Sequence, residues 1–116
     1  AAFNNKISTD LLDTSGTGQI RTYQYGGGAL DQVYSSGSAY SPGVNVPYNI
    51  AARHGDTFIN AAVDGTVLTA NTTPTSLPDL SSTPLELATT GGGMHIKEFA
   101  IWSEDIGDAG IGKVTT

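Results

Sequence analysis

Residues 94–111 read MHIKEFAIWSEDIGDAGI, and this stretch decides the fold that we expect for the chain. Within it, residues 96–102 alternate in the manner of an extended strand, because successive side chains of a strand point to opposite faces. Phe99 and Ile101 fall on one face. The opposite face carries Glu98, Ala100 and Trp102. The pattern predicts a strand that ends in an aromatic residue.

A short turn follows this predicted strand. Ile106 and Ile111 lie five residues apart across a Gly-Asp-Ala-Gly sequence, which is too short for an independent helix. We expect the two isoleucines to pack against the end of the strand and to hold it in place.

The length and composition of the chain indicate one domain. A chain of 116 residues has room for a single core and buries roughly two thirds of its unfolded surface. Cysteine is absent, so disulfides and thiolate metal sites are excluded. Only 14% of the residues are charged, and small neutral polar side chains suit strand-rich surfaces better than long solvated helices.

The charge balance narrows the possible partners. Five Lys and Arg against eleven Asp and Glu give a net charge of −6, which opposes binding to phosphate backbones. We therefore expect no nucleic-acid partner. No apolar run approaches the roughly 18 to 20 residues that a membrane span requires, so we expect no membrane insertion.

Turn-forming residues divide the chain into short segments. Gly, Pro, Asn and Asp interrupt nearly every window of about ten residues, the spacing of an all-β sandwich or barrel. Asp64-Gly65 is a two-residue hairpin sequence, and three prolines in residues 71–84 predict a connection without regular pairing. Besides residues 96–102, we expect strands at residues 6–12, 19–25, 30–34, 48–54, 57–63, 66–69 and 85–88.

The ordered motifs of residues 48–111 resemble laminin-G-like, concanavalin A-like domains. IAARHGD at residues 50–56 is similar to a Val-Ala-x-x-Tyr-Asp-Gly strand, and INAAVDG at residues 59–65 to a strand ending in Val-Asn-Gly or Val-Asp-Gly. LELA at residues 85–88 corresponds to a Leu-x-Ile-Gly strand, and residues 96–111 to a closing strand and Leu-Ser-x-x-Glu-Ile turn. This sequence looks most like the versions found in bacteriophage structural proteins.

The resemblance implies an all-β fold, an antiparallel two-sheet β-sandwich of the concanavalin A-like jelly-roll type. A single domain would span residues 1–116, with divergent N-terminal strands and a loop in residues 1–47 and the best-matching portion in residues 48–111. Because the part before Ile50 is short, we expect the sandwich to be incomplete within this chain. An uncovered sheet edge favours pairing, so we expect self-association or contacts with other virion proteins.

The carboxylates do not form the pattern of a glycosidase. Retaining hydrolysis needs two carboxyl groups about 5 to 5.5 Å apart, and laminarinase-type enzymes place them on one strand as Glu-x-Asp-x-Glu. None of Glu86, Glu98 and Glu104 belongs to such a motif. No nucleophile-elbow sequence accompanies His54 or His95. We predict no catalytic residues and no enzymatic activity, and a glycan-cleaving enzyme is the least favoured alternative.

Residues 56–64 superficially resemble the metal loop of legume lectins, Asp-x-Tyr-x-Asn-x-x-x-x-Asp. Asp56, Asn60 and Asp64 would offer the hard oxygen ligands that Ca²⁺ prefers. His54 stands where that loop has Glu, and the final Asp is one residue too near. The interpretation that we favour is a strand between two turns, with both aspartates as turn formers.

Four aromatic residues are candidates for stacking on sugar rings: Tyr23, Tyr25, Tyr34 and Trp102. Tyr23 and Tyr25 share one face of a predicted strand, and Tyr34 precedes a Ser- and Gly-rich loop. The interpretation that we favour is that the tyrosine pair packs within the sheet and that Trp102 covers an edge of the sandwich.

The sequence predicts a non-enzymatic structural or adhesive module of a larger assembly, located in a virion or outside the cell. The resemblance implies a bacteriophage fibre, tail or capsid-decorating protein that contacts host-surface glycans. A carbohydrate-binding, lectin-like module of a secreted or surface protein is the alternative. Apart from Ca²⁺ in the lectin-like loop, no cofactor is expected.

Overall fold

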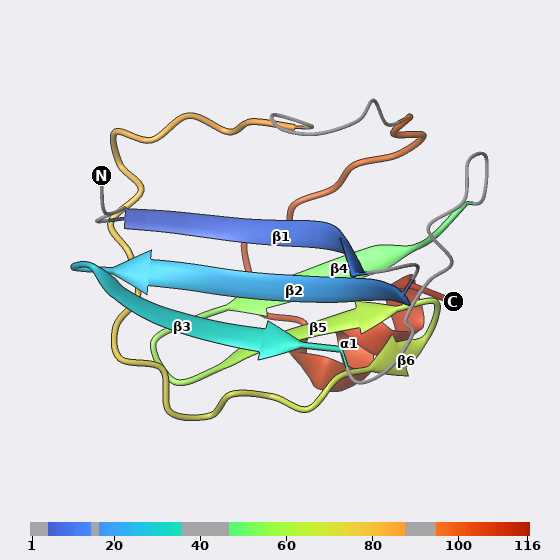
Figure 1. Ribbon diagram of the computed structural model, residues 1–116, viewed down its shortest axis with the longest axis horizontal. Helices are drawn as coiled ribbons and strands as arrows, with labels where there is room; N and C mark the ends of the chain where they lie inside the picture. The colour runs from blue at the N-terminus through green and yellow to red at the C-terminus, as the bar shows by residue number, and fades with distance from the viewer. Residues whose placement is uncertain (1–4, 15–16, 36–46, 88–94) are drawn as a thin grey trace.

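The computed structural model describes residues 5–14, 17–35, 47–87 and 95–116 (Figure 1). Most of its regular structure is β. The strands are β1 (Asn5–Thr14), β2 (Thr17–Gly26), β3 (Ala29–Tyr34), β4 (Ile50–His54), β5 (Ile59–Val63) and β6 (Thr66–Val67), and one helix follows, α1 (Gly107–Val114). The all-β class expected from the sequence is therefore confirmed at this level. In the part of the chain that the structure describes, no helix has the length and apolar character needed to cross a membrane.

The strands form two antiparallel sheets of three strands each. The first sheet has the order β1-β2-β3 and the second the order β4-β5-β6. In the first sheet Thr22 of β2 stands opposite Thr9 of β1 and Val33 of β3. In the second, His54 of β4 stands opposite Ile59 of β5. Each sheet is built only from strands that are consecutive in the sequence, which is the simplest antiparallel topology.

Positive backbone φ angles mark the tight turns that the sequence predicted. Asp64 and Gly65 between β5 and β6 have φ of 45° and 83°, as a two-residue hairpin of the primed type requires. Gly27 and Gly28 between β2 and β3 have φ of 60° and 87°. Glycine adopts this conformation without steric cost, so the glycine run fixes the β2–β3 register.

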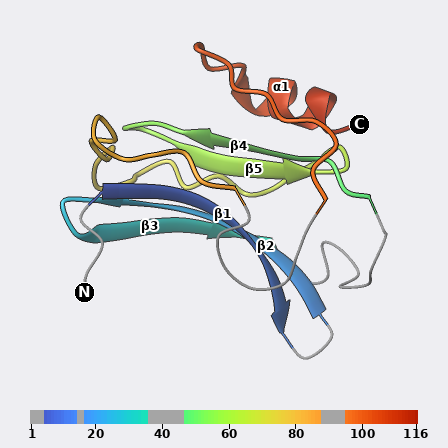
Figure 2. The same cartoon turned by 90° about the horizontal axis from the view of Figure 1, so that it is seen from above.

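Figure 2 shows three layers, with the second sheet lying between the first sheet and α1. All five side chains of β5 are buried, because one face of the strand packs on the first sheet and the other on the helix. Cross-strand partners point to the same face, so Ile59, Ala61 and Val63 share the inner face with His54. Asn60 and Ala62 face α1.

The space between the sheets holds both apolar and polar side chains. Ile20 and Val33 of the first sheet and Ile59 of the second supply its buried apolar part. Thr22 and Gln24 of β2 are also fully buried on this face. Buried polar groups are stable only when hydrogen-bonded, so the inner layer depends on specific partners as well as on packing.

Helix α1 corrects the expectation of a short turn after the closing segment. Gly107–Val114 form a helix whose Ile111 is buried, although three of the eight residues are glycine. Gly112 lies so close to Val67 that a Cβ would come within 2.8 Å of its Cγ2 atom. The Thr115 hydroxyl accepts a hydrogen bond from the Gly65 N–H at 3.0 Å. Tertiary contacts therefore stabilise a helix that is too short and too glycine-rich to form alone.

The strands expected at residues 85–88 and 96–102 are absent from the part of the chain that the structure describes. Residues 96–102 are irregular, and Phe99, Ile101 and Trp102 are 50%, 73% and 51% exposed. Residues 85–87 are also irregular and exposed, and Ala88 lies outside the described residues. Alternation fixes which face of a segment is apolar, but a strand forms only where a neighbour supplies the hydrogen-bond ladder. The remaining predicted strands are confirmed, with shifts of at most two residues at their ends.

The inner core provides a first test of this packing. Ile59→Ala removes a side chain that is 0% exposed and leaves a cavity between the sheets. We expect the free energy of unfolding to fall by about 2 to 5 kcal/mol, measured by urea denaturation. Leu77→Ala, at a position that is half exposed, is the matched control and should change it by less than about 0.5 kcal/mol. Equal effects of the two substitutions would contradict the burial of β5.

Candidate functional site

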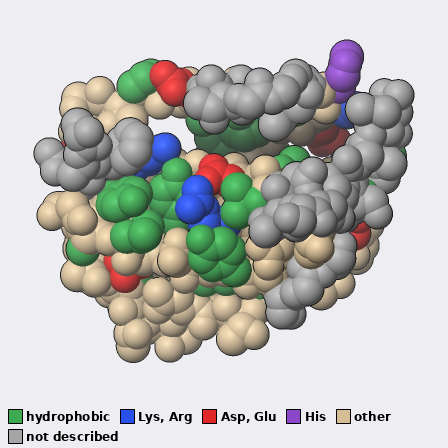
Figure 3. All heavy atoms as spheres, in the orientation of Figure 1, with side chains coloured by type: hydrophobic (Ala, Val, Ile, Leu, Met, Phe, Trp, Pro, Cys, Tyr) green, Lys and Arg blue, Asp and Glu red, His purple; other side chains and the backbone are tan. Residues whose placement is uncertain are grey.

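The outward face of the first sheet gathers three of the four aromatic candidates. In the sheet register, Tyr25 stands opposite Lys6 and Leu30, and Arg21 stands opposite Asp10 and Tyr34. The tyrosine face, as we name it, consists of the outward side chains of β1 to β3: Lys6, Ser8, Asp10, Arg21, Tyr23, Tyr25, Leu30, Gln32 and Tyr34. Figure 3 views it directly, with a basic and an acidic group at its centre and apolar side chains around them.

Tyr23 supports this face from below. Its side chain is only 6% exposed, and the Arg21 guanidinium lies 4.4 Å from its ring centroid. The Lys6 ammonium lies 5.4 Å from the same centroid on β1. The Tyr25 ring meets Tyr23 edge to face at 5.8 Å, a favoured geometry for two aromatic rings. The packing that the sequence favoured thus describes Tyr23, whose ring orients its neighbours.

Tyr25 and Tyr34 are the rings that remain accessible. Tyr34 is 44% exposed, and Tyr25 is half-buried. Tyr34 stands opposite Arg21, which is four residues from Tyr25 along β2. At about 3.4 Å per residue the two rings are therefore separated by roughly 13 Å along the strand direction.

An ion pair occupies the centre of the tyrosine face. The Arg21 guanidinium donates a hydrogen bond to the Asp10 carboxylate, which also accepts one from the Ser8 hydroxyl at 2.8 Å. Both charged side chains are 26% exposed. Donor and acceptor groups held in fixed positions beside aromatic rings are what recognition of a polar ligand requires.

Trp102 does not belong to the tyrosine face. It lies in the segment that leads into α1. This helix packs on the face of the second sheet that points away from the first sheet (Figure 2). The structure therefore separates Trp102 from the three tyrosines with which the sequence grouped it.

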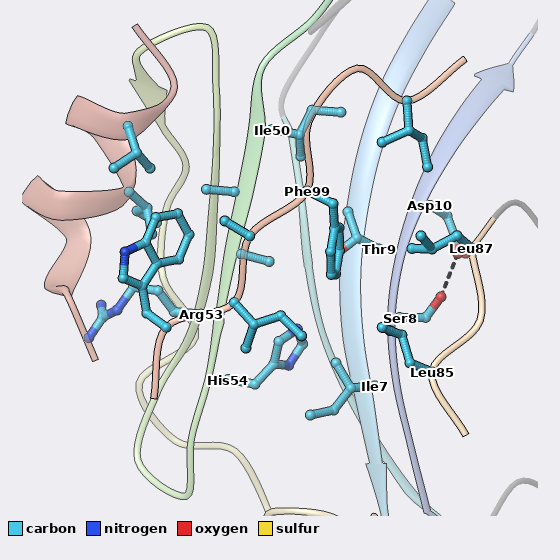
Figure 4. Close-up of a pocket in the computed structure, with 18 of the residues that line it drawn as sticks. Ile7, Ser8, Thr9, Asp10, Ile50, Arg53, His54, Leu85, Leu87 and Phe99 are labelled. Atoms are coloured by element: carbon cyan, nitrogen blue, oxygen red, sulfur yellow. Dashed lines mark hydrogen bonds between the residues drawn. The ribbon is translucent and has the colours of Figure 1, made fainter. Parts of the chain in front are cut away.

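A groove of about 2670 Å³ adjoins β1 and β4. Figure 4 shows Ile7 and Thr9 of β1 on one side, Ile50 and His54 of β4 on the other, and Phe99 between them. The groove exists because each sheet ends at this point, with β1 and β4 as edge strands. Its walls are the inner surfaces of a sandwich that is open on one side.

Gln24 links three parts of the fold at the inner end of this groove. Its amide nitrogen donates to the carbonyl oxygens of Gly55, at 3.2 Å, and Ser76, at 3.0 Å. Its amide oxygen accepts a hydrogen bond from Nδ1 of His54 at 3.2 Å, which fixes the proton on that ring nitrogen. The amide thereby joins β2 to the second sheet and to the irregular segment after β6.

His54 is held neutral between the sheets. Its Nε2 lies 2.9 Å from the Thr22 hydroxyl, which is the donor when Nδ1 carries the proton. Burial lowers the pKa of His54 from 6.5 to about 4, because the charged imidazolium loses its hydration. The Thr22 oxygen also lies 3.1 Å from the Thr9 hydroxyl, which donates to it while Thr22 donates to His54, so the polar network extends to β1.

The three candidate calcium ligands are placed along β5 rather than around one point. Asp56 precedes the strand and is exposed, whereas Asp64 follows it and accepts a hydrogen bond from the Asn49 N–H at 2.8 Å. Seven residues lie between the two aspartates, and the five of them that form β5 extend roughly 16 Å. Asn60 is fully buried, and its amide donates to the Leu68 carbonyl oxygen at 3.0 Å. The described ranges contain no cluster of three or more His, Asp or Glu side chains suited to a metal ion. Calcium binding stays a prediction.

The glutamates and the second histidine lie on irregular, exposed parts of the chain. Glu86 belongs to residues 80–87, and Glu98 and Glu104 belong to the segment before α1, as does His95. A different acidic group is engaged there: Asp105 accepts a hydrogen bond from Nε of Arg53 at 2.7 Å. This bond, with the Gly107 N–H as a second donor, lowers the pKa of Asp105 to about 2.

Sequence reasoning missed Asp10 and Arg21 as members of the site. Arg21 shares the alternation of Tyr23 and Tyr25 along one strand, so its place on their face was readable from the sequence. The place of Asp10 could not be read from the sequence, because its position beside Arg21 depends on the β1–β2 register.

No protein-family model, curated protein or solved structure shows a significant match to this chain.

The buried histidine predicts an acid-sensitive fold. Between pH 6.5 and 4 the unfolded chain binds a proton at His54 and the folded chain does not, so stability falls as the pH falls through this window. The expected loss of unfolding free energy is on the order of 3 kcal/mol, from about 1.4 kcal/mol per pKa unit. Urea titrations at a series of pH values measure it.

Two variants separate this effect from general acid denaturation. His54→Gln removes the titrating group, so its stability should change less with pH across this window. His95→Gln, at an exposed histidine, should behave as the unaltered chain does. Identical pH dependence in both variants would show that His54 is not the group responsible.

Proposed function

We propose that this domain is a non-enzymatic structural and adhesive module of a larger assembly, a bacteriophage fibre, tail or capsid-decorating protein, and that its tyrosine face contacts host-surface glycans. The observation that carries the proposal is the gathering of Tyr25, Tyr34 and the Arg21–Asp10 pair on one solvent-facing sheet surface. The phage context rests on the resemblance of residues 48–111 to laminin-G-like domains of such proteins.

The chemistry of the tyrosine face suits a sugar chain. Aromatic rings offer flat apolar surfaces to the C–H faces of pyranoses, and their hydroxyl groups stay in water. Level with Tyr34 in the sheet register, Arg21 presents donors and Asp10 presents acceptors to hydroxyl groups. A spacing of roughly 13 Å along the strand exceeds one sugar ring, so the face suits an extended oligosaccharide.

The rigidity of the surface supports the proposed adhesive role. The contacting side chains lie on paired strands, and Tyr23 holds both Arg21 and Tyr25 in position. A site on regular strands loses little conformational freedom on binding, which favours affinity. Two packed antiparallel sheets also suit the proposed jelly-roll sandwich, of which the described strands would be one part.

Membership of a larger assembly accounts for the apolar surface that remains uncovered. Large apolar side chains are at least 42% exposed on the first sheet and on the irregular segments: Leu11, Leu30, Leu77, Leu85, Leu87 and Ile96. Contiguous exposed apolar surface marks interaction sites in proteins that do not aggregate. We include self-association or contact with other virion proteins in the proposal for this reason.

A lectin-like module of a secreted or surface protein is the second candidate. The same tyrosine face favours it, because glycan binding there does not depend on a virion context. The two candidates differ in the assembly around the domain: the first requires multiple copies or virion partners, and the second does not.

Glycan binding is tested on an array of bacterial surface polysaccharides and oligosaccharides. Tyr25→Ala and Tyr34→Ala should each weaken binding to the glycans retained by the unaltered chain, by about five-fold for a loss of about 1 kcal/mol of stacking. Tyr25→Phe keeps the ring and should bind more strongly than Tyr25→Ala.

Tyr48→Ala is the matched control, because this tyrosine precedes β4 and lies outside the tyrosine face. It should leave glycan binding unchanged. Absence of binding by the unaltered chain across the array would contradict the adhesive role. Equal losses of glycan binding in Tyr25→Ala, Tyr34→Ala and Tyr48→Ala would show that the tyrosine face is not the binding surface.

The assembly is tested by the molar mass in solution. Light scattering coupled to size-exclusion chromatography should give a multiple of 11.9 kDa at micromolar concentrations. A monomer at every concentration would contradict self-association and would leave the glycan experiment as the test of the second candidate.

A further inference from the structure

The open edge of β4 is the most distinctive unpartnered feature of the second sheet. Within the described strands, β4 pairs with β5 on one side only. The inward side chains Ile7, Thr9 and Leu11 of β1 face the groove beside that edge, and Leu11 is 42% exposed. One strand added to β4 would lie over these three residues. The groove thus places apolar side chains of β1 beside an unpaired strand edge.

The segment at residues 96–102 already lies against this opening. Figure 4 shows Phe99 inside the groove, between Ile50 of β4 and Thr9 of β1. The segment is seven residues long, so it extends about 23 Å as a strand and covers the five residues of β4, about 17 Å. Its backbone belongs to no strand ladder among the described residues, and its large apolar side chains are about half exposed or more.

The alternation of the segment matches the two environments on either side of the β4 edge. With Phe99 directed into the groove, Ile101 shares its face and meets the inward side of β1. Ala100 and Trp102 then point to the opposite face, on which Arg53 and α1 lie. Any shift of one residue would turn Phe99 and Ile101 away from the groove.

An ionic contact holds the end of the segment near this edge. Arg53 of β4 binds Asp105, at 2.7 Å from Nε to Oδ1, and also binds Asp108 at the start of α1. The guanidinium is packed at 4.2 Å from the centroid of the Phe58 ring. The segment is therefore tethered three residues beyond Trp102, which gives it a high effective concentration at the β4 edge.

We propose that the β4 edge is a strand-acceptor site and that its occupant is residues 96–102 of the same chain, which change from the irregular conformation of the structure to a strand that pairs with β4 and closes the groove. A second copy is the less favoured source of the strand, because it lacks the tether and carries the same net charge of −6. The pairing extends the second sheet to four strands and covers Ile7, Thr9 and Leu11.

Hydrogen exchange on the unaltered chain tests the proposal directly. Backbone pairing should slow exchange at alternate amides of residues 96–102 by at least about ten-fold relative to an unstructured peptide. The same alternation should appear at the open side of β4. Exchange at unprotected rates throughout residues 96–102 would overturn the proposal.

Proline substitutions provide a matched pair of variants. Ala100→Pro removes one N–H and the local backbone freedom within the pairing segment. It should abolish protection across residues 96–102 and shift Trp102 fluorescence to longer wavelength. Ser103→Pro lies just beyond the segment and should preserve both signals. If both variants keep their protection from hydrogen exchange, the segment does not pair with β4.

Varying the protein concentration shows whether the strand comes from the same chain or from a second copy. Pairing within one chain predicts protection that is independent of protein concentration and present in the monomer fraction. Protection that rises with concentration together with a dimer mass would assign the strand to a second copy and overturn pairing within the chain. This experiment reads backbone protection, so its result is independent of glycan binding.

Discussion

The fold depends on the buried amide of Gln24. This side chain is 0% exposed and joins β2 to His54 and Gly55 of the second sheet and to Ser76 of the irregular segment. A polar group at this depth is costly unless its hydrogen bonds are made, so the partners specify the distance and the orientation of the two sheets. Apolar contacts alone would allow the sheets to slide.

The same strand connects this network to the proposed binding surface. Gln24 points inward from β2, and its neighbours Tyr23 and Tyr25 point outward onto the tyrosine face. Fixing the inner side of the strand therefore fixes the base on which Arg21 and the two rings are arranged. The tyrosine face gains its rigidity from hydrogen bonds on the opposite surface of the sheet, which is how a binding site is held in a productive geometry.

Sheet edges explain both the open groove and the exposed apolar surface. A sheet of three strands has two unpaired edges, and proteins usually cover or charge them. Here β5 is buried on both faces, whereas β4 and β1 end in the groove. The second sheet is well protected at its centre and open at one side. The distribution suits a domain whose remaining strand positions are filled by its own chain or by the assembly.

Local signals in the sequence identified most of the strands. Alternation in β2, the Asp64-Gly65 hairpin and the glycine run after β2 each predict a structure that neighbouring residues suffice to specify. Residues 96–102 show the limit of this reasoning. Their alternation is as clear as that of β2, but β2 has hydrogen-bonding neighbours on both sides and residues 96–102 have no ladder in the structure.

The sequence predicted the candidate site only in part, for the same reason. The sequence placed Tyr23 and Tyr25 on one face, because alternation is a local property. It could not separate their roles, since the burial of Tyr23 depends on Lys6 of β1 and Arg21 of β2, which both lie beside its ring.

The sequence by itself thus determined the all-β class, the turns and the faces of individual strands. Only the tertiary structure decided that Asp10 meets Arg21, that Trp102 lies apart, and that a glycine-rich segment becomes α1. These features depend on register and on packing between residues far apart in the chain, which no local pattern encodes.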